Sequence, residues 1–371
     1  MESYCLESRF LLDLLCDRQP SQFNKINYEK LIELASFHDS TALIFYRLQK
    51  YSQRFPETNY SFLKSRYLGN IRVNLKFWNE FLQISTEFEK SNIAMLPIKG
   101  IDILVRFYPV FDLRSMVDID ILIREEQFGQ AEKVLFALGY QKKIFNLKEE
   151  EYWRKQQCHV RFHKNRIVVE VHWGLDFKRG SRVILPRLWE RTQKKEVGSY
   201  KINLLSPEDA LFSFALHLRR YGNILSLKQV FDVAKIIKES PGFDWEYVLK
   251  ECKNGKIEAT IYFILMQVDL FTETTIPLEI FRRLNLACWQ KMLIKRLIKR
   301  HTFQISATPK KNYLCAHFLL YDNLFEPISY LINIPYEQFC KFYNLEPYTY
   351  KANILYRLRF LYMPISLSKN V

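Results

Sequence analysis

The segment LPIKGIDILVRFYPVFDLRSMVDIDILI, residues 96–123, limits the folds open to this chain more than any other segment. Its pattern predicts a strand, a Lys-Gly turn, an amphipathic helix, a loop and a second strand. Because successive side chains of a strand point to opposite faces, Asp118 and Asp120 are expected on one face, roughly 6–7 Å apart. The second strand therefore directs two carboxylates at one point.

Two aspartates on one strand face are unfavourable by themselves. Asp is among the poorest strand formers, and like charges that share a face repel each other. A divalent cation removes this repulsion, and Mg²⁺ is typically held by one or two protein carboxylates together with water and substrate phosphate oxygens. The alternative is an edge strand whose acidic face is hydrated.

The Lys99-Gly100 turn stands at a strand-to-helix junction, and an apolar pattern with helical spacing begins at Ile101. Glycine lets backbone N–H groups approach an anion, and the N-terminus of a helix favours negative charge. A neighbouring lysine is a natural partner for phosphate. The turn is therefore a candidate phosphate site, although many such turns contain glycine and bind no ligand.

A third acidic residue lies in the later apolar run IVVEVHW, residues 167–173. Glu170 interrupts this run and shares its strand face with His172. Residues 158–163 precede it and predict a hairpin around the turn 164–166. Glu170 is the candidate third carboxylate, while a histidine on a strand is more often structural than ligand-binding.

Zinc is a further option in this hairpin, because Cys158, His159, His163 and His172 lie close together in the sequence. Strand alternation, however, puts Cys158 on the face opposite His159 and His163. The four side chains are therefore not expected to converge on one ion.

Together these motifs resemble a known group of proteins. The Lys-Gly turn, the Arg-containing loop, DIDIL, and an apolar strand with an acid followed by His-Trp are similar to the uncharacterised bacterial nucleotidyltransferases of the DNA polymerase β-like superfamily. The similarity covers roughly residues 25 to 270 and includes LLSPEDALFSFALHL, residues 204–218. It implies transfer of a nucleoside monophosphate, AMP being the commonest, from a nucleoside triphosphate to an acceptor hydroxyl, with release of pyrophosphate.

The resemblance also implies roles for the motif residues. Asp118 and Asp120 are expected to hold Mg²⁺ or Mn²⁺, and Glu170 to complete a second metal site or to accept the acceptor's proton. The remaining members of the predicted site would bind the nucleotide; they are Lys99, Gly100, Arg114, Ser115 and His172. The wider superfamily has Gly or Ser directly after the turn glycine, where this chain has Ile101. In this chain Ser115 of the following loop either supplies the hydroxyl that a serine would provide after the turn glycine, or no residue supplies it.

The predicted fold class is α+β, with a small mixed β-sheet in a nucleotidyltransferase core flanked by helical regions. Apolar residues at three- and four-residue intervals predict helices before and after the core. We expect an N-terminal helical region at 1–92, the catalytic core at 93–205, a helical bundle at 206–280 and a basic helical extension at 281–371. Ser206 and Pro207 have the N-cap and first-turn pattern that begins a helix.

The composition of the chain indicates in which cellular compartment the protein is expected. No apolar run reaches the 18 or more residues that a membrane-spanning helix requires, and the first residues lack the basic and apolar blocks of a signal peptide. The seven cysteines are scattered and have no Cys-x-x-Cys spacing, which favours reduced thiols. A cytoplasmic location is expected.

Residues 281–371 carry fourteen Lys and Arg against four Asp and Glu, and so supply ten of the net +15 charges. Such a region can bind an anionic membrane surface, a nucleic acid or an acidic partner, or it can be a hydrated face over an extra helical layer. This region supports the alternative to an enzyme, a catalytically degenerate binding or scaffold protein. Retention of all three carboxylates favours the enzyme.

Overall fold

The computed structural model describes residues 4–107, 112–142, 158–176, 185–220, 226–303, 305, 318–323 and 336–359. It has the predicted α+β class, and its centre is a mixed sheet of five strands in the order β1-β2-β5-β4-β3. The strands are β1 (Met95–Pro97), β2 (Ile119–Ile123), β3 (Gln141–Lys142), β4 (His159–Lys164) and β5 (Ile167–His172). Only the β2–β5 pair is parallel.

The described parts of the segment 96–123 fold largely as expected, but Asp118, which was expected in the second strand, lies just before it. β1 ends at the Lys-Gly turn, α5 (Gly100–Phe107) follows at once, and β2 returns antiparallel beside β1. A separate hairpin of β6 (Gln193–Val197) and β7 (Tyr200–Leu204) follows the sheet in the chain. Between β5 and β6 lies α8 (Leu185–Glu190).

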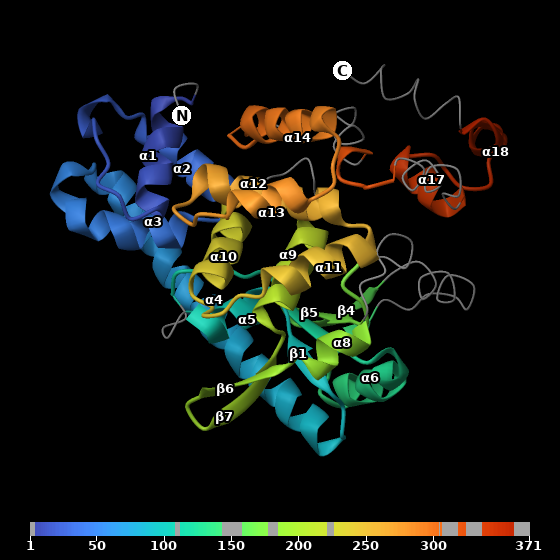
Figure 1. Cartoon of the computed structure of the whole chain (residues 1–371). Coiled ribbons are helices and arrows are strands. Elements are labelled where there is room, and N and C mark those ends of the chain that lie inside the picture. Colours follow the sequence, from blue (N-terminus) through green and yellow to red (C-terminus); the bar gives the residue numbers. More distant parts are fainter. Residues whose placement is uncertain are drawn as a thin grey trace.

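Helices α4 and α6 cover one face of the sheet (Figure 1). The helix α4 (Glu57–Lys90) has 34 residues and is therefore about 50 Å long. Its C-terminal half and α6 (Phe128–Ala137) pack against strand residues such as Ile119, Ile121 and Val169. Because strands alternate, the opposite face carries Asp120, Leu122, Glu170 and His172.

The opposite face belongs to a second, larger core that combines the N-terminal helices with the C-terminal bundle. The N-terminal elements are α1 (Leu6–Leu15), η1 (Phe23–Lys25), α2 (Tyr28–Phe37), α3 (Thr41–Leu48) and η2 (Gln49–Arg54). The bundle comprises α9 (Pro207–Arg220), α10 (Leu227–Lys238), α11 (Trp245–Gly255), α12 (Glu258–Phe271), α13 (Leu278–Arg283) and α14 (Cys288–His301). Leu122 of the sheet lies in the same core, so the bundle is packed against the face with the acidic residues.

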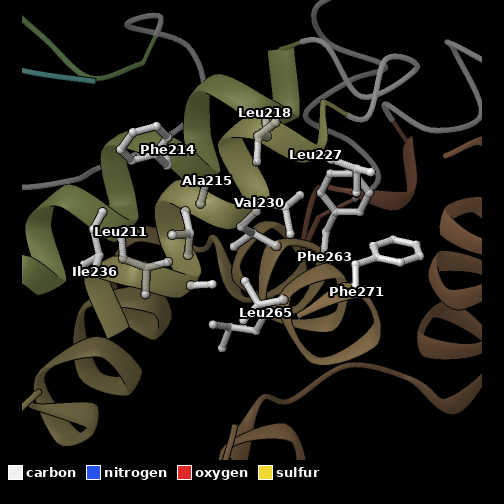
Figure 2. Packing of buried hydrophobic residues seen from close by; sticks show 14 of the residues in the cluster. Leu211, Phe214, Ala215, Leu218, Leu227, Val230, Ile236, Phe263, Leu265 and Phe271 are labelled. Carbon is white, nitrogen blue, oxygen red and sulfur yellow. The ribbon is translucent and has the colours of Figure 1, made fainter. Parts of the chain in front are cut away.

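Helix α12 is the centre of the bundle, because nearly all of its side chains are buried. Figure 2 shows Phe263, Leu265 and Phe271 of α12 among apolar side chains of α9 and α10, including Leu211 and Val230. A helix that is apolar on every side has to be surrounded by others. The distant α17 (Tyr336–Phe342) and α18 (Tyr350–Arg357) form a small cluster of their own.

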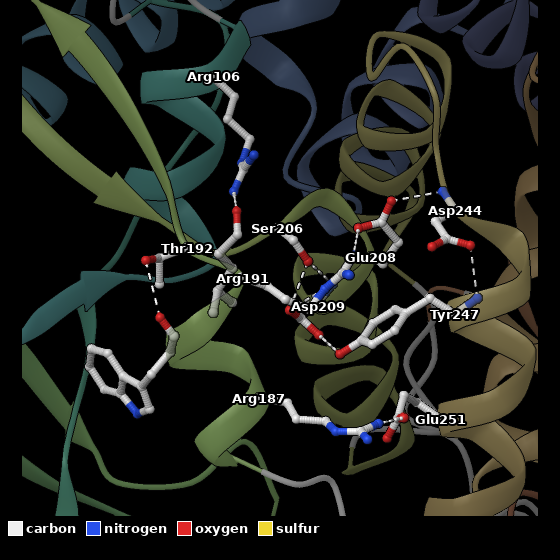
Figure 3. Close-up of polar contacts among 12 residues, drawn as sticks. Arg106, Arg187, Arg191, Thr192, Ser206, Glu208, Asp209, Asp244, Tyr247 and Glu251 are labelled. Carbon is white, nitrogen blue, oxygen red and sulfur yellow. Dashed lines mark hydrogen bonds and ion pairs between the residues drawn. The ribbon is translucent and has the colours of Figure 1, made fainter.

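A polar network fixes α8 and α11 to the start of α9 (Figure 3). Ser206 caps α9 as predicted, since its Oγ accepts from the Asp209 N–H at 3.1 Å. Arg191 donates to Glu208 at 2.8 Å, and Tyr247 donates to Asp209 at 2.8 Å. The acids in the first turn of α9, Glu208 and Asp209, therefore join the core to the bundle as well as stabilising the helix end.

No helix in the described part of the chain combines the length and the hydrophobicity needed to cross a bilayer.

The core of the bundle gives a first prediction. Leu211→Ala removes a side chain that is fully buried between α9 and its neighbours, so it should lower the free energy of unfolding by about 2–5 kcal/mol in urea denaturation. Leu278→Ala is the matched control, because Leu278 is 72% exposed, and it should change stability by less than about 0.5 kcal/mol. Equal effects of the two substitutions would contradict the packing described for α9.

Candidate active site

Strand register brings the acidic residues together. Asp120 of β2 is the direct partner of Glu170 on the parallel strand β5. On the other side of β5, β4 places Arg161 opposite Glu170 and His159 opposite His172. Asp120 and Glu170 are only 3% and 4% exposed, so two negative charges lie buried side by side. A buried charge without a partner is very costly, and the site must contain compensating positive charge.

Lys99 supplies part of that charge. Its ammonium lies 2.6 Å from Asp120 Oδ1 and 3.9 Å from Glu170 Oε2. Its φ is +53°, an uncommon value for a residue with a side chain. This left-handed residue lets α5 begin directly after β1, with the Lys99 carbonyl accepting from the Ile103 N–H. The turn therefore holds the lysine over the carboxylates.

His172 is the second cation. Its Nε2 lies 2.9 Å from Asp120 Oδ1 and 3.4 Å from Glu170 Oε2. On the other side of Glu170, the Arg161 guanidinium donates to Oε1 at 2.6 Å. Asp120, Glu170 and His172 offer one donor atom each within 4.8 Å of one another, close enough to hold a metal ion.

The electrostatics follow from these contacts. Burial raises the pKa of Asp120, but the Lys99 ammonium and the His172 imidazole outweigh it and hold that pKa well below its usual range. Burial acts on Glu170 in the same way, and the hydrogen bond from His172 helps to lower its pKa to about 2. Burial and Lys99 lower the pKa of His172, yet hydrogen bonds to Asp120, Cys158 and Glu170 raise it to about 9. At neutral pH Lys99, His172 and Arg161 thus place three positive charges beside the two anions Asp120 and Glu170.

Asp118 is different from the other two acids. It precedes β2, it is half-buried, and it has no hydrogen bond or ion pair with another residue that the structure describes. Burial, followed by the charges of Asp120 and Glu170, raises the pKa of Asp118 to about 6. The charges of Lys99 and Arg161 offset only part of this rise, and Asp118 is not one of the three convergent donors.

The sequence was compared with known proteins. Residues 24–273 match the family described as "Uncharacterised nucleotidyltransferase". The chain belongs to this family. Membership supports a transferase that moves a nucleotidyl group, and it confirms the resemblance drawn from the motifs. No curated protein matches the chain.

Among solved structures, the chain is similar to the solution structure of the antibiotic-resistance factor ANT(2'')-Ia, a protein with substrate-regulated conformation dynamics. The match has a TM-score of 0.34 and 10% sequence identity, and it covers 45% of this chain and 85% of that chain. Likeness at this level transfers nothing from that protein to this nucleotidyltransferase.

Arg114 and Ser115 of the nucleotidyltransferase do not join the carboxylates. Arg114 forms a buried ion pair with Asp232 of α10, in which Nε lies 2.9 Å from Oδ2. The Ser115 hydroxyl donates to the Asp39 carbonyl at 3.0 Å, and Asn74 donates to the Arg114 carbonyl at 2.7 Å. In this structure both residues anchor the loop before β2 to the surrounding helices.

Packing requires a glycine at position 100, in addition to the predicted role of this residue in binding phosphate. A Cβ at this position would lie 2.8 Å from Met116 Sδ and 3.2 Å from Arg114 Nη1. The absent side chain therefore makes room for the returning loop. A role of the backbone in binding phosphate stays a prediction.

Two neighbours of Glu170 were not predicted as such: Arg161 was not a candidate, and His159 was considered only for zinc. The hairpin register contained the signal, because alternate residues of the first strand had to face Glu170 and His172. The argument against convergence in this hairpin was also wrong for three of its four residues. Donor atoms of Cys158, His159 and His172 lie within 4.8 Å of one another, since Cys158 precedes β4 in a bend where strand alternation does not apply.

The raised pKa of Asp118 predicts a pH dependence in buffer free of divalent metal. The folded protein holds this proton with a pKa of about 6 against an ordinary 3.8, so the free energy of unfolding falls as pH rises from about 4 to about 6. Asp118→Asn should lack this loss and be more stable than the wild type by about 1–2 kcal/mol at pH 8. The difference should disappear near pH 4 in urea denaturation; a constant difference across this range would refute the assignment.

The Arg114–Asp232 pair gives a further prediction. Arg114→Met leaves a buried, unpaired carboxylate and should lower the free energy of unfolding by about 3–5 kcal/mol. Adding Asp232→Leu removes that charge and should recover most of the loss, as measured in a double-mutant cycle. A loss below about 1 kcal/mol for the single variant would show that Arg114 is not needed for the fold.

Proposed function

We propose that this protein transfers a nucleoside monophosphate, AMP first among them, from a nucleoside triphosphate to an acceptor hydroxyl, with Mg²⁺ or Mn²⁺ bound at Asp118, Asp120 and Glu170. The observation that supports it is the in-register pair of Asp120 and Glu170 on parallel strands, in a chain of a nucleotidyltransferase family. Asp118, two residues before Asp120, completes a set of three acids.

The residues present fit a divalent cation. The convergent donors are two carboxylates and one imidazole, and carboxylates suit Mg²⁺ and Mn²⁺. The imidazole of His172 shifts the preference toward Mn²⁺. When bound at such acids, divalent cations neutralise triphosphate oxygens and polarise the α-phosphorus for attack.

The protein's own residues prepare this site. Lys99 and His172 neutralise Asp120 and Glu170 until a cation arrives, which keeps the buried acids ionised and in place. With a cation at these acids, the Lys99 ammonium would be available to contact phosphate, the role that its position after β1 favours. Because ligation requires a neutral imidazole, His172 gives up its proton if it joins the ligands.

Glu170 is better suited to binding than to accepting a proton. Its pKa of about 2 makes it a weak base, whereas a general base works best when its pKa lies near the working pH. The ligand role is therefore favoured over the base role for this residue.

One observation favours a binding or scaffold protein instead. On α14 the side chains of Lys295, Arg296, Lys299 and Arg300 are exposed, and none forms an ion pair within the described residues. Arg114 and Ser115 are also engaged in anchoring contacts, which leaves fewer residues for the triphosphate. Binding of a nucleotide at the acids distinguishes the transferase from the binding or scaffold protein.

The test is a titration of ATP, GTP, CTP and UTP, each with Mg²⁺ or Mn²⁺, followed by heat and by thermal unfolding. One triphosphate should stabilise the wild type only when metal is present, by about 2.7 kcal/mol at a hundredfold excess over its Kd. The double variant Asp118→Asn/Asp120→Asn should show no such stabilisation and no formation of product from labelled nucleotide.

Asp269→Asn is the control, because this exposed acid of α12 lies outside the site and should leave binding unchanged. Circular dichroism verifies that each variant is folded. If no triphosphate binds with either metal, the transferase proposal is wrong and the scaffold function takes its place.

A further inference from the structure

We propose that Cys158, His159 and His172 form a second metal site, beside the carboxylates, for a borderline-soft divalent cation such as Zn²⁺. One donor atom from each residue lies within 4.8 Å of the other two. The Cys158 thiol sulfur is 3.8 Å from His159 Nδ1. The site does not rest on the proposed nucleotidyl transfer, because metal binding can be measured without any nucleotide.

The hairpin builds this site at its open end. His159 is the first residue of β4 and lies opposite His172, the last residue of β5. Their rings are stacked, with centroids 4.8 Å apart and planes 25° from parallel. Two neighbouring imidazoles on one sheet face are thus fixed by backbone pairing.

Cys158 is fixed from the other side. Its carbonyl accepts from the Trp173 N–H at 2.9 Å, so this bend residue is held to the residue that follows β5. A Cβ on Gly174 would lie 3.3 Å from the Cys158 Cβ, so the glycine leaves the cysteine just enough space. Cys158 and His172 are 1% and 2% exposed. The thiol is therefore held against the imidazoles and away from bulk solvent.

The donor chemistry selects the ion. Thiolate and imidazole are the ligands that Zn²⁺ prefers, with Zn–S near 2.3 Å and Zn–N near 2.0–2.1 Å. At a tetrahedral angle these bond lengths place sulfur and nitrogen about 3.6 Å apart. The observed separation of 3.8 Å between Cys158 Sγ and His159 Nδ1 is close to that value. Mg²⁺ avoids sulfur, so this group and the all-oxygen pair Asp118 and Asp120 differ in the metals that they select.

Glu170 supports the site from behind. The other ring nitrogen of His159, Nε2, lies 3.9 Å from Glu170 Oε2. A carboxylate on the far nitrogen of a ligating histidine orients the ring and raises its basicity. Three protein donors also leave a fourth position for water or for a carboxylate oxygen. His172 belongs both to this group and to the group of Asp120, Glu170 and His172, so the two sites share one side chain.

The experiment is a Co²⁺ titration of the full-length, chelator-treated protein, followed by competition with Zn²⁺. Co²⁺ should bind with a near-ultraviolet thiolate charge-transfer band that saturates at one equivalent and is lost when Zn²⁺ is added. Cys158→Ser should abolish the band and weaken Zn²⁺ binding at least roughly 100-fold, and His159→Gln should also weaken it. Cys288→Ser, at an exposed cysteine, should change neither.

Thiol alkylation mapped by mass spectrometry tests the wild type directly. Because the Cys158 thiol is buried, its alkylation is followed over time at urea concentrations below the unfolding transition, where local opening exposes it. Zn²⁺ should slow the reaction of Cys158 and leave that of the exposed Cys5 and Cys288 unchanged, which keeps the proposal testable if a variant does not fold. Zn²⁺ bound without protection of Cys158, a charge-transfer band that persists in Cys158→Ser, or no binding of Zn²⁺ at micromolar concentration would each overturn the proposal. Zinc binding with no response to nucleotides would support this site while the transferase proposal fails.

Discussion

The pairing of two buried carboxylates across the parallel strands β2 and β5 is the constraint on which the site depends. Asp120 and Glu170 are direct partners in the sheet, and neither can be buried as an anion without a nearby cation. Lys99 and His172 meet that requirement within the chain. Arg161 adds a third positive charge beside Glu170, and Asp118 lies next to the cluster with its pKa raised by burial and by the two neighbouring acids.

The surrounding helices serve to hold this face of the sheet. Helices α4 and α6 close the apolar face, and the bundle around α12 packs against the acidic one. The loop before β2 is fastened to that bundle by the buried Arg114–Asp232 pair. The position of the acids is therefore coupled to the packing of α10, more than a hundred residues later in the chain.

Much of this arrangement was predictable from the sequence. The strand, turn, helix and strand around Lys99 follow from local apolar periodicity, and the hairpin before Glu170 follows from alternation and a turn signal. Contacts between residues far apart in the sequence could not be predicted. No feature of the sequence around Arg114 indicates that it pairs with Asp232 rather than being free to bind phosphate. Alternation also failed at Cys158, because a residue just outside a strand does not obey the strand's two-residue period.

The central claim is that these acids bind a divalent cation, and anomalous diffraction tests it most directly. Crystals grown with Mn²⁺ and a non-hydrolysable ATP analogue should show an anomalous peak within bonding distance, about 2.1 Å, of carboxylate oxygens of Asp118 and Asp120. The Lys99 ammonium should then have left Asp120 for the triphosphate. A nucleotide-bound structure in which Lys99 still contacts Asp120, with no anomalous peak at the acids, would contradict the account.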